Sequence, residues 1–244
     1  MSNNPARTAV ILQPGYLPWL GFFEQMYCCD IFVVYDDVQY DKHSWRNRNR
    51  IKTSQGWQWL SVPVLTSGHN KPINKEILID NSHNWRVKHH AAIQQNYSKA
   101  AYFSQYFDAF DAIYKAEWKY LIDLDMALIS KLCEFMGLQR QIVFASDLNI
   151  GGRSTERLIA ICHALNADSF YEGKAGETYI APAVFQEAGV RLIYQDYHHP
   201  VYRQQYGKFI PYMSTVDLLF NHGPDSLDIL SLRKTVALGE ENQT

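Results

Sequence analysis

The stretch AVILQPGYLPWLGFFEQMYCCDIFVVYDD, residues 9–37, decides the fold. Its first four residues, 9–12, form a short apolar run that ends at Gln13-Pro14-Gly15, which is typical of a strand followed by a tight turn. Residues 17–29 are apolar on most sides, which predicts a buried helix. Residues 31–35 are β-branched or aromatic, which predicts a second buried strand. Strand, turn, helix and strand together make one βαβ unit.

The rest of the chain continues the alternation of strands and helices. Further strands are expected at 57–64, 73–79, 142–145, 168–171 and 190–194, and further helices at 154–166, at 180–188 and from Ser214. This order predicts an α/β fold with a mainly parallel, doubly wound sheet, into which a helical segment of three parts is inserted at about 84–137. Residues 1–232 are expected to form a single α/β domain, and the polar residues 233–244 a flexible tail.

Length and composition exclude several classes of protein. Of the 244 residues 47% are hydrophobic and 20% charged, which excludes a disordered chain. With 23 basic and 25 acidic residues the net charge is -2, so nucleic acid is not an expected partner. No apolar run reaches the ~18 residues of a membrane span, and the start has no signal-peptide core, so we expect a cytoplasmic protein without a membrane partner. The four cysteines lack metal-ligand spacing, which favours reduced thiols.

Two segments fall at the carboxyl ends of the predicted strands, where ligands of parallel sheets collect. The first is the turn that opens the first helix, because a helix N-terminus can bind an anion. Its candidate binding residues are Gln13, Tyr16 and Trp19. The alternative is a plain turn with Trp19 packed on the core. The turn lacks the Gly-x-x-x-x-Gly-Lys-Ser/Thr pattern of a Walker-type nucleotide site.

The second segment begins with the carboxylate pair Asp36-Asp37, our candidate catalytic residues, and includes Gln39 as a candidate binding residue. Carboxylates at a strand end can act as a base, orient a substrate amine or hold Mg²⁺. Adjacent strand residues point to opposite faces, so at most one of the pair is expected to face the crevice. The alternative is that one of them caps the following loop.

Residues 42–52 form a loop with five basic residues and no acidic one. Forked guanidinium groups match phosphate or carboxylate, so the loop predicts a bound anion, with an aromatic ring to stack on a planar or sugar ring. On an extended chain Arg46, Arg48 and Arg50 would share one face and the two asparagines the other. The candidate binding residues are Trp45, Arg46, Asn47, Arg48, Asn49 and Lys52. The alternative is a solvated charged loop, and support for RNA binding is thin.

Three later segments are weaker candidates. Residues 173–179 follow a predicted strand, and Gly173 would allow a ligand close to the backbone, with Tyr179 beside it. Ser214 and Asp217 stand at the start of a predicted helix with the spacing of a capping box. A role as a helix cap explains these two residues at least as well as substrate binding does. His198-His199 lacks the partners of a zinc site, and no metal is predicted.

These segments carry a resemblance to the WbqC-like family. It rests on Gln-Pro-x-Tyr-x-Pro-Trp-x-Gly-Phe-Phe from Gln13, Asp-x-Phe-Val-x-x-Asp-x-Val-Gln-Tyr from Asp30, Trp-x-Asn-Arg-Asn-x-Ile-Lys from Trp45 and Ser-x-x-Asp-Leu-Leu-Phe-Asn-x-Gly from Ser214. The similarity runs from about Thr8 to about Leu230. It implies a role in bacterial surface-polysaccharide (O-antigen, lipopolysaccharide) or natural-product biosynthesis, with transfer of a glycine-like or other acyl group to an amine of a sugar or related metabolite.

A weaker, architectural resemblance is to adenylate-forming nucleotidylyltransferases of the pantothenate synthetase type. Their first helix carries His-x-Gly-His, whereas Pro18-Trp19-Leu20-Gly21 keeps the glycine and lacks both histidines. We therefore expect a transferase for a phosphate-bearing small molecule, with ATP or another activated donor as a possible cofactor and no need for a metal. Nucleotidyl transfer onto a sugar phosphate or acid, and non-catalytic binding of a nucleotide or carbohydrate, remain the alternatives. The oligomeric state is left open.

Overall fold

The computed structural model describes residues 6–42, 44–66 and 71–233. Within these ranges the chain forms two compact units, each assembled from three separate segments. Unit 1 comprises the residues up to Gln13, Glu24–Val38 and Arg140–His198, and unit 2 comprises Pro14–Phe23, Gln39–Gln139 and the residues from His199 onward. The single domain over 1–232 stays a prediction. Of the expected tail at 233–244, all but Arg233 lies outside the described residues.

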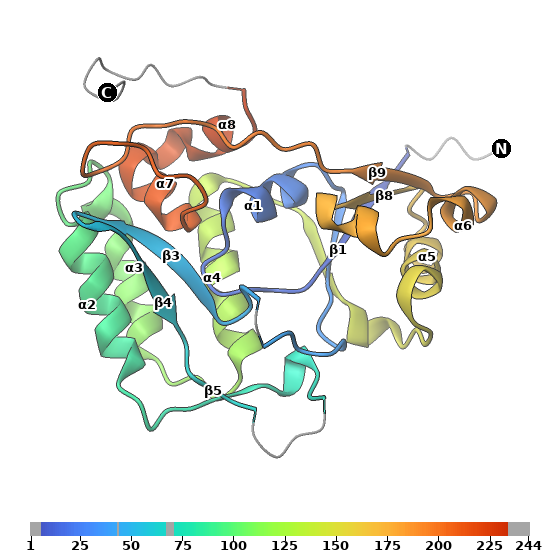
Figure 1. Cartoon of the computed structure of the whole chain (residues 1–244), viewed down its shortest axis with the longest axis horizontal. Coiled ribbons are helices and arrows are strands. Elements are labelled where there is room, and N and C mark those ends of the chain that lie inside the picture. The colour runs from blue at the N-terminus through green and yellow to red at the C-terminus, as the bar shows by residue number, and fades with distance from the viewer. Residues whose placement is uncertain (1–5, 43, 67–70, 234–244) are drawn as a thin grey trace. The chain divides into compact units, whose positions relative to one another are not determined.

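Unit 1 is built on a five-stranded parallel sheet in the order β7-β2-β1-β8-β9 (Figure 1). Its strands are β1 (Thr8–Leu12), β2 (Ile31–Val34), β7 (Gln141–Phe144), β8 (Ser169–Glu172) and β9 (Arg191–Tyr194). Its helices are α5 (Ser154–Ala164), α6 (Pro182–Glu187) and the 3-10 turns η2 (Ala145–Leu148) and η3 (Lys174–Thr178). The parallel βαβ unit predicted from residues 9–37 is confirmed, with α1 (Leu20–Tyr27) as its helix.

The sheet of unit 1 is buried around β1 and β2 because these strands are apolar over residues 9–12 and 31–34. Every residue of β2 is buried, as expected for a parallel strand that is covered on both faces. Ala9 and Ile11 of β1 share a core with Leu158 of α5 and Phe170 of β8. β2 lies next to β1 on one side in the sheet, and β8 lies next to β1 on the other side. The strand order therefore reverses between β1 and β8. Open parallel sheets bind ligands at the carboxyl ends of the strands at such a switch point.

Unit 2 contains the helical segment expected at about 84–137, and its three parts are confirmed. They are α2 (Trp85–Tyr97), α3 (Phe103–Lys115) and α4 (Leu121–Met136), and α3 packs on both of the others (Figure 1). The aromatic stripe of α3 belongs to the core, since Tyr106, Phe107 and Phe110 are buried. The unit ends with α7 (Thr215–His222), η4 (Gly223–Asp225) and α8 (Ser226–Leu230).

The strands of unit 2 differ from expectation in two places. β3 (Arg48–Thr53) and β4 (Gly56–Ser61) form an antiparallel hairpin, and the strand expected over 57–64 breaks after Ser61. Pro63 has no N–H for a ladder, and the chain resumes as β5 (Val64–Leu65). The strand expected over 73–79 shrinks to β6 (Leu78–Ile79), which pairs with β5 and follows a 3-10 turn, η1 (Asn74–Glu76).

The residues at the N-termini of α5 and α7 differ in whether a side chain caps the helix. A serine can cap a helix, but α5 begins at Ser154 itself, and the capping position is held by Arg153, which makes no side-chain cap. Ser214 does cap α7, because its hydroxyl accepts a hydrogen bond from the Val216 N–H at 3.4 Å. Across the described ranges, no helix combines the length and the apolar character needed to cross a membrane.

Candidate functional site

The carboxyl edge of the parallel sheet in unit 1 collects polar side chains from every strand. They are Gln13 after β1, Asp36 after β2, Ser146 after β7, Glu172 at the end of β8 and Gln195 after β9. Because all five strands are parallel, these positions lie along one edge of the sheet. Of the predicted site residues, Gln13, Asp36, Asp37, Gly173 and Tyr179 therefore belong to this unit.

Asp36 and Asp37 are both engaged by neighbours in unit 1. Asp36 is 2% exposed and accepts two hydrogen bonds from Ser146, from its N–H at 3.0 Å and its hydroxyl at 2.6 Å. Asp37 forms an ion pair at 2.5 Å with Arg157, which is itself buried. The other Asp37 oxygen, Oδ1, is buried with no hydrogen-bond partner among the described residues. These contacts fasten the end of β2 to η2 and α5, and a catalytic role for either carboxylate stays a prediction.

Glu172 is the carboxylate with the most unusual environment at this edge. It is 7% exposed, and burial raises its pKa from 4.5 to about 7. Its Oε1 atom accepts hydrogen bonds from the Gly173 N–H at 3.1 Å and from the Tyr179 hydroxyl at 3.3 Å, which oppose this rise. A carboxyl group with a pKa near neutrality can give and take a proton at physiological pH, which is the property of a general acid or base.

Amide side chains line the edge beside Glu172. The Gln25 Nε2 atom of α1 donates to Gln195 Oε1 at 3.3 Å, and the Gln195 N–H donates to the Glu172 carbonyl at 2.8 Å. A Cβ atom on Gly173 would lie 3.4 Å from Gln25 Nε2, an ordinary van der Waals distance, so the space at this position does not require a glycine. The Gln195 Nε2 atom in turn donates to the Glu24 carboxylate, so the carboxyl group of raised pKa lies beside a buried chain of hydrogen-bonded amides.

The second half of the basic loop forms β3 of the β3–β4 hairpin in unit 2. The outer face of this hairpin carries arginine and tryptophan side chains. Arg48 and Arg50 share this face, as predicted, whereas Arg46 precedes the strand. The Arg48 guanidinium lies 4.8 Å from the Trp59 ring centre, and that of Arg50 lies 5.1 Å from Trp45 and 5.0 Å from Trp57. The three tryptophans are about 40% exposed (41%, 44% and 38% for Trp45, Trp57 and Trp59). Such cation–π contacts hold both arginines in place.

The remaining predicted residues of the loop interact with other groups inside unit 2, and three of them bind main-chain carbonyls. Asn47 donates to the Val62 carbonyl at 2.8 Å, and the buried Asn49 donates to the Leu17 carbonyl at 2.7 Å. Lys52 is 1% exposed, and its ammonium donates to the Lys208 carbonyl at 2.5 Å. Burial lowers its pKa. Arg46 acts electrostatically on the buried carboxyl of Asp125, whose pKa burial raises.

The predicted residues of the first turn also lie in unit 2. Tyr16 is fully buried, and its hydroxyl hydrogen-bonds His89 Nδ1 at 2.8 Å and the Tyr114 hydroxyl at 2.5 Å. Trp19 forms an isolated bridge with Ser214 and stacks on His199, with ring centres 6.4 Å apart. Gln39 is exposed and forms a bridge with Ile73. Tyr16 and Trp19 are thus held by the interior of the unit rather than facing an open turn.

Asp217 is the centre of a buried hydrogen-bond cluster. It is fully buried and accepts from the Tyr97 hydroxyl at 2.9 Å, the Tyr202 hydroxyl at 2.9 Å and Gln204 Nε2 at 2.8 Å. Burial raises its pKa, and the three donors and the Lys52 charge oppose that rise. Since its carboxylate is taken up here, Asp217 does not complete a capping box with Ser214. The cluster ties α2, α7 and the loop before α7 together.

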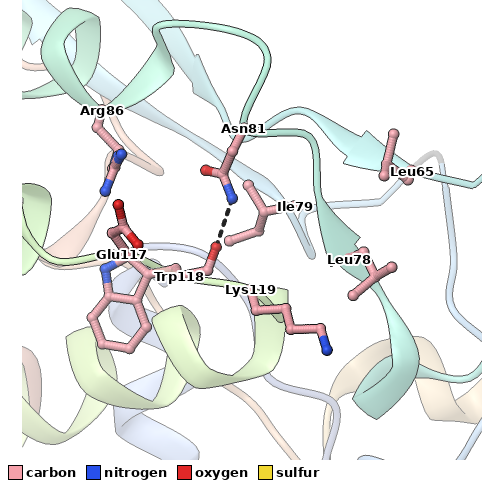
Figure 2. A pocket seen from close by; sticks show the side chains of 8 residues that line it. All are labelled: Leu65, Leu78, Ile79, Asn81, Arg86, Glu117, Trp118 and Lys119. Atoms are coloured by element: carbon pink, nitrogen blue, oxygen red, sulfur yellow. Dashed lines mark hydrogen bonds between the residues drawn. The ribbon is translucent and has the colours of Figure 1, made fainter.

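Two cavities in unit 2 were not foreseen from the sequence. The one in Figure 2 has a volume of about 510 Å³ and lies beside β6 and the loop between α3 and α4. Arg86 and Glu117 extend toward each other there, and Asn81 Nδ2 donates to the Trp118 carbonyl at 2.8 Å (Figure 2). Its lining thus mixes both signs of charge. The second cavity, of about 460 Å³, is lined by β4 and the first turns of α2.

Two sets of functional candidates escaped sequence reasoning. Glu172 stands next to the predicted Gly173, so its place at a strand end was visible, but its burial and raised pKa were not. Trp57 and Trp59 are spaced by two residues in a predicted strand, which was a signal for one shared face. Among the described residues, no group of three or more His, Cys, Asp or Glu side chains is placed to hold a metal ion.

Comparison with known proteins places the chain in a family. No solved structure matches it. A curated relative, Uncharacterized protein Rv1507c of Mycobacterium tuberculosis (strain ATCC 25618 / H37Rv), is 37% identical over 226 residues, which cover 92% of this chain and 97% of the relative. The model of the WbqC-like protein family matches residues 13–229, which include all four motifs quoted above. The chain therefore belongs to the WbqC-like protein family.

Proposed function

We propose that this chain is a transferase that joins a glycine-like or other acyl group to an amine of a sugar or related metabolite, in bacterial surface-polysaccharide or natural-product biosynthesis. The single observation that carries the proposal is Glu172, buried at the carboxyl end of β8 with its pKa raised to about 7. Membership of the WbqC-like family supports the substrate class. The acyl group arrives activated, by ATP or in another activated donor.

In this reaction the amine nitrogen attacks the carbonyl carbon of the acyl donor. A C–N bond forms, and the bond from the acyl carbon to the leaving group breaks, with its electron pair going to the leaving group. The proton lost by the nitrogen passes to the Glu172 carboxylate, which suits this role because its pKa lies near the working pH. Gln25 orients the polar substrate, and Gln195, bonded to Gln25 and Glu24, holds its amide in position.

The test is an incubation of the full chain with aminosugar nucleotides, glycine and ATP, in which mass spectrometry detects an amide product. Replacing Glu172 by Gln should lower kcat by about 100-fold or more, the usual contribution of a general base. Glu187→Gln, at an exposed position in α6, is the matched control and should leave the rate unchanged. Absence of amide product from a broad panel of donors and acceptors, or full activity of Glu172→Gln, would overturn the proposal.

A second candidate, nucleotidyl transfer onto a sugar phosphate or acid, is favoured by the switch point between β1 and β8, where open parallel sheets bind nucleotides. The same incubation separates the two reactions. Release of pyrophosphate with a nucleotidylated product and no amide identifies nucleotidyl transfer. Saturable binding without turnover would instead identify a non-catalytic binding protein.

A further inference from the structure

The second cavity of unit 2 has the size and the walls of a small-molecule site. Its volume is about 460 Å³, within the range of about 300–1,000 Å³ that is typical of ligand pockets. Trp59 of β4 and Trp85 of α2 supply aromatic walls. His89 is held rigidly beside them, because its ring hydrogen-bonds both the Tyr16 hydroxyl and the Ser61 backbone. A rigid wall of this kind lowers the entropic cost of binding.

The charge of this lining favours an anion. Its charged side chain is Lys88, and the lining includes no carboxylate, in contrast to the cavity of Figure 2, where Glu117 faces Arg86. The His83 ring also lines the cavity and contacts Asp80 at 3.4 Å. The Lys88 ammonium makes no ion pair or hydrogen bond with any of the described residues. The Arg48 guanidinium, 4.8 Å from the Trp59 ring centre, adds positive charge beside the same wall. A ligand with one negative group is therefore attracted by the positive charges of Lys88 and Arg48.

The uncharged polar groups of the lining favour a hydroxylated ligand. The Gln58 amide and the Ser61 hydroxyl line the cavity, and neither side chain hydrogen-bonds any part of the described structure. Amide and hydroxyl groups both donate and accept, which suits the hydroxyls of a sugar. Trp59 is 38% exposed, and an indole ring can cover the apolar C–H face of a sugar ring.

We propose that this cavity is a binding site for a sugar phosphate. The Trp59 ring packs on the sugar, Gln58 and Ser61 hydrogen-bond its hydroxyls, and Lys88 binds the phosphate. The site consists of residues of unit 2 alone and does not rest on the acyl transfer proposed for Glu172. It would remain if that reaction were disproved.

The first experiment is calorimetric titration of the full chain with glucose 1-phosphate, glucose, inorganic phosphate and uridine monophosphate in separate runs. Glucose 1-phosphate should bind saturably and about tenfold or more tighter than glucose, the difference that follows from a charge-assisted hydrogen bond. Equal affinity for inorganic phosphate would reduce the site to a surface anion site and overturn the proposal. Tighter binding of uridine monophosphate would assign the cavity to a flat base instead, and no saturable binding of glucose 1-phosphate would also refute it.

Matched variants then locate the binding. Trp59→Ala should weaken glucose 1-phosphate binding by about fivefold or more, the usual loss for an aromatic contact. Tyr206→Ala, which removes a similarly exposed aromatic ring of unit 2 outside the cavity, should not. Lys88→Ala should lower the affinity to that for glucose, whereas Lys119→Ala, which removes a lysine from the cavity in Figure 2, should leave it unchanged. Equal losses within either pair would show that the ligand binds elsewhere.

Discussion

Glu172 makes the stability of unit 1 depend on pH in a direction opposite to that of most carboxylates. In the folded chain its pKa is about 7, against an ordinary value of 4.5 that the unfolded chain restores. Between these two pH values the unfolded state loses the proton and the folded state keeps it, so stability falls as pH rises. One pKa unit corresponds to about 1.4 kcal/mol, so the full penalty above pH 7 is about 3 kcal/mol. Below pH 4.5 both states hold the proton and the penalty vanishes.

Replacing Glu172 by Gln removes this titration and keeps a side-chain oxygen for the Gly173 N–H and the Tyr179 hydroxyl. Urea unfolding, followed by circular dichroism between pH 4.5 and pH 8, gives the free energy of unfolding of both proteins. The advantage of the variant over the natural chain should grow by about 3 kcal/mol across this range, most of it below pH 7. Glu187→Gln is the control and should show no such trend. A difference between Glu172→Gln and the natural chain that stays constant with pH would refute the reasoning.

Three further predictions concern single contacts, and the free energy of urea unfolding measures all of them. Asp217→Ala leaves three buried donors without an acceptor and should cost about 3–5 kcal/mol. Asp228→Ala, which removes an exposed ion pair with Arg233, should change stability little, and equal effects of the two substitutions would contradict this. Asp37→Ala leaves the buried Arg157 guanidinium without its carboxylate partner and should cost about 3 kcal/mol of stability. Adding Arg157→Met should restore part of that loss, and purely additive losses in the double variant would refute the pairing. Asn49→Ala removes one buried and one partly buried hydrogen bond and should cost about 2 kcal/mol of stability, and a loss below about 0.5 kcal/mol would contradict this.

The parallel sheet of unit 1 could be predicted because its signal is local. The runs at 9–12 and 31–35 are apolar without interruption, and only a strand covered on both faces accommodates such a run. The helix α3 was likewise visible in the three-to-four-residue spacing of its aromatic side chains. The strand expected at 73–79 was wrong over most of its length, since an alternating pattern there coincides with a 3-10 turn at Asn74–Glu76. Short alternating runs do not separate strands from turns.

The partners of the candidate site residues could not be predicted, because they are distant in the chain. Asp36 binds Ser146, 110 residues away, and Asp37 binds Arg157, 120 residues away. The raised pKa of Glu172 likewise depends on burial by the rest of unit 1. A sequence shows which side chains are acidic or basic. Which of them are neutralised by a neighbour, and which keep an unusual pKa, depends on tertiary contacts.

The interleaving of the two units limits how this protein can be taken apart. The chain passes from one unit to the other within α1, after Val38, after Gln139 and after His198, in addition to the passage after Gln13. A truncation at any of these points removes a strand from the parallel sheet or a helix from the other unit. Neither unit can be expressed as one uninterrupted fragment, so fragment studies need split chains that reassemble or a rearranged gene. Insertions for labels or fusions belong in the loops inside a unit.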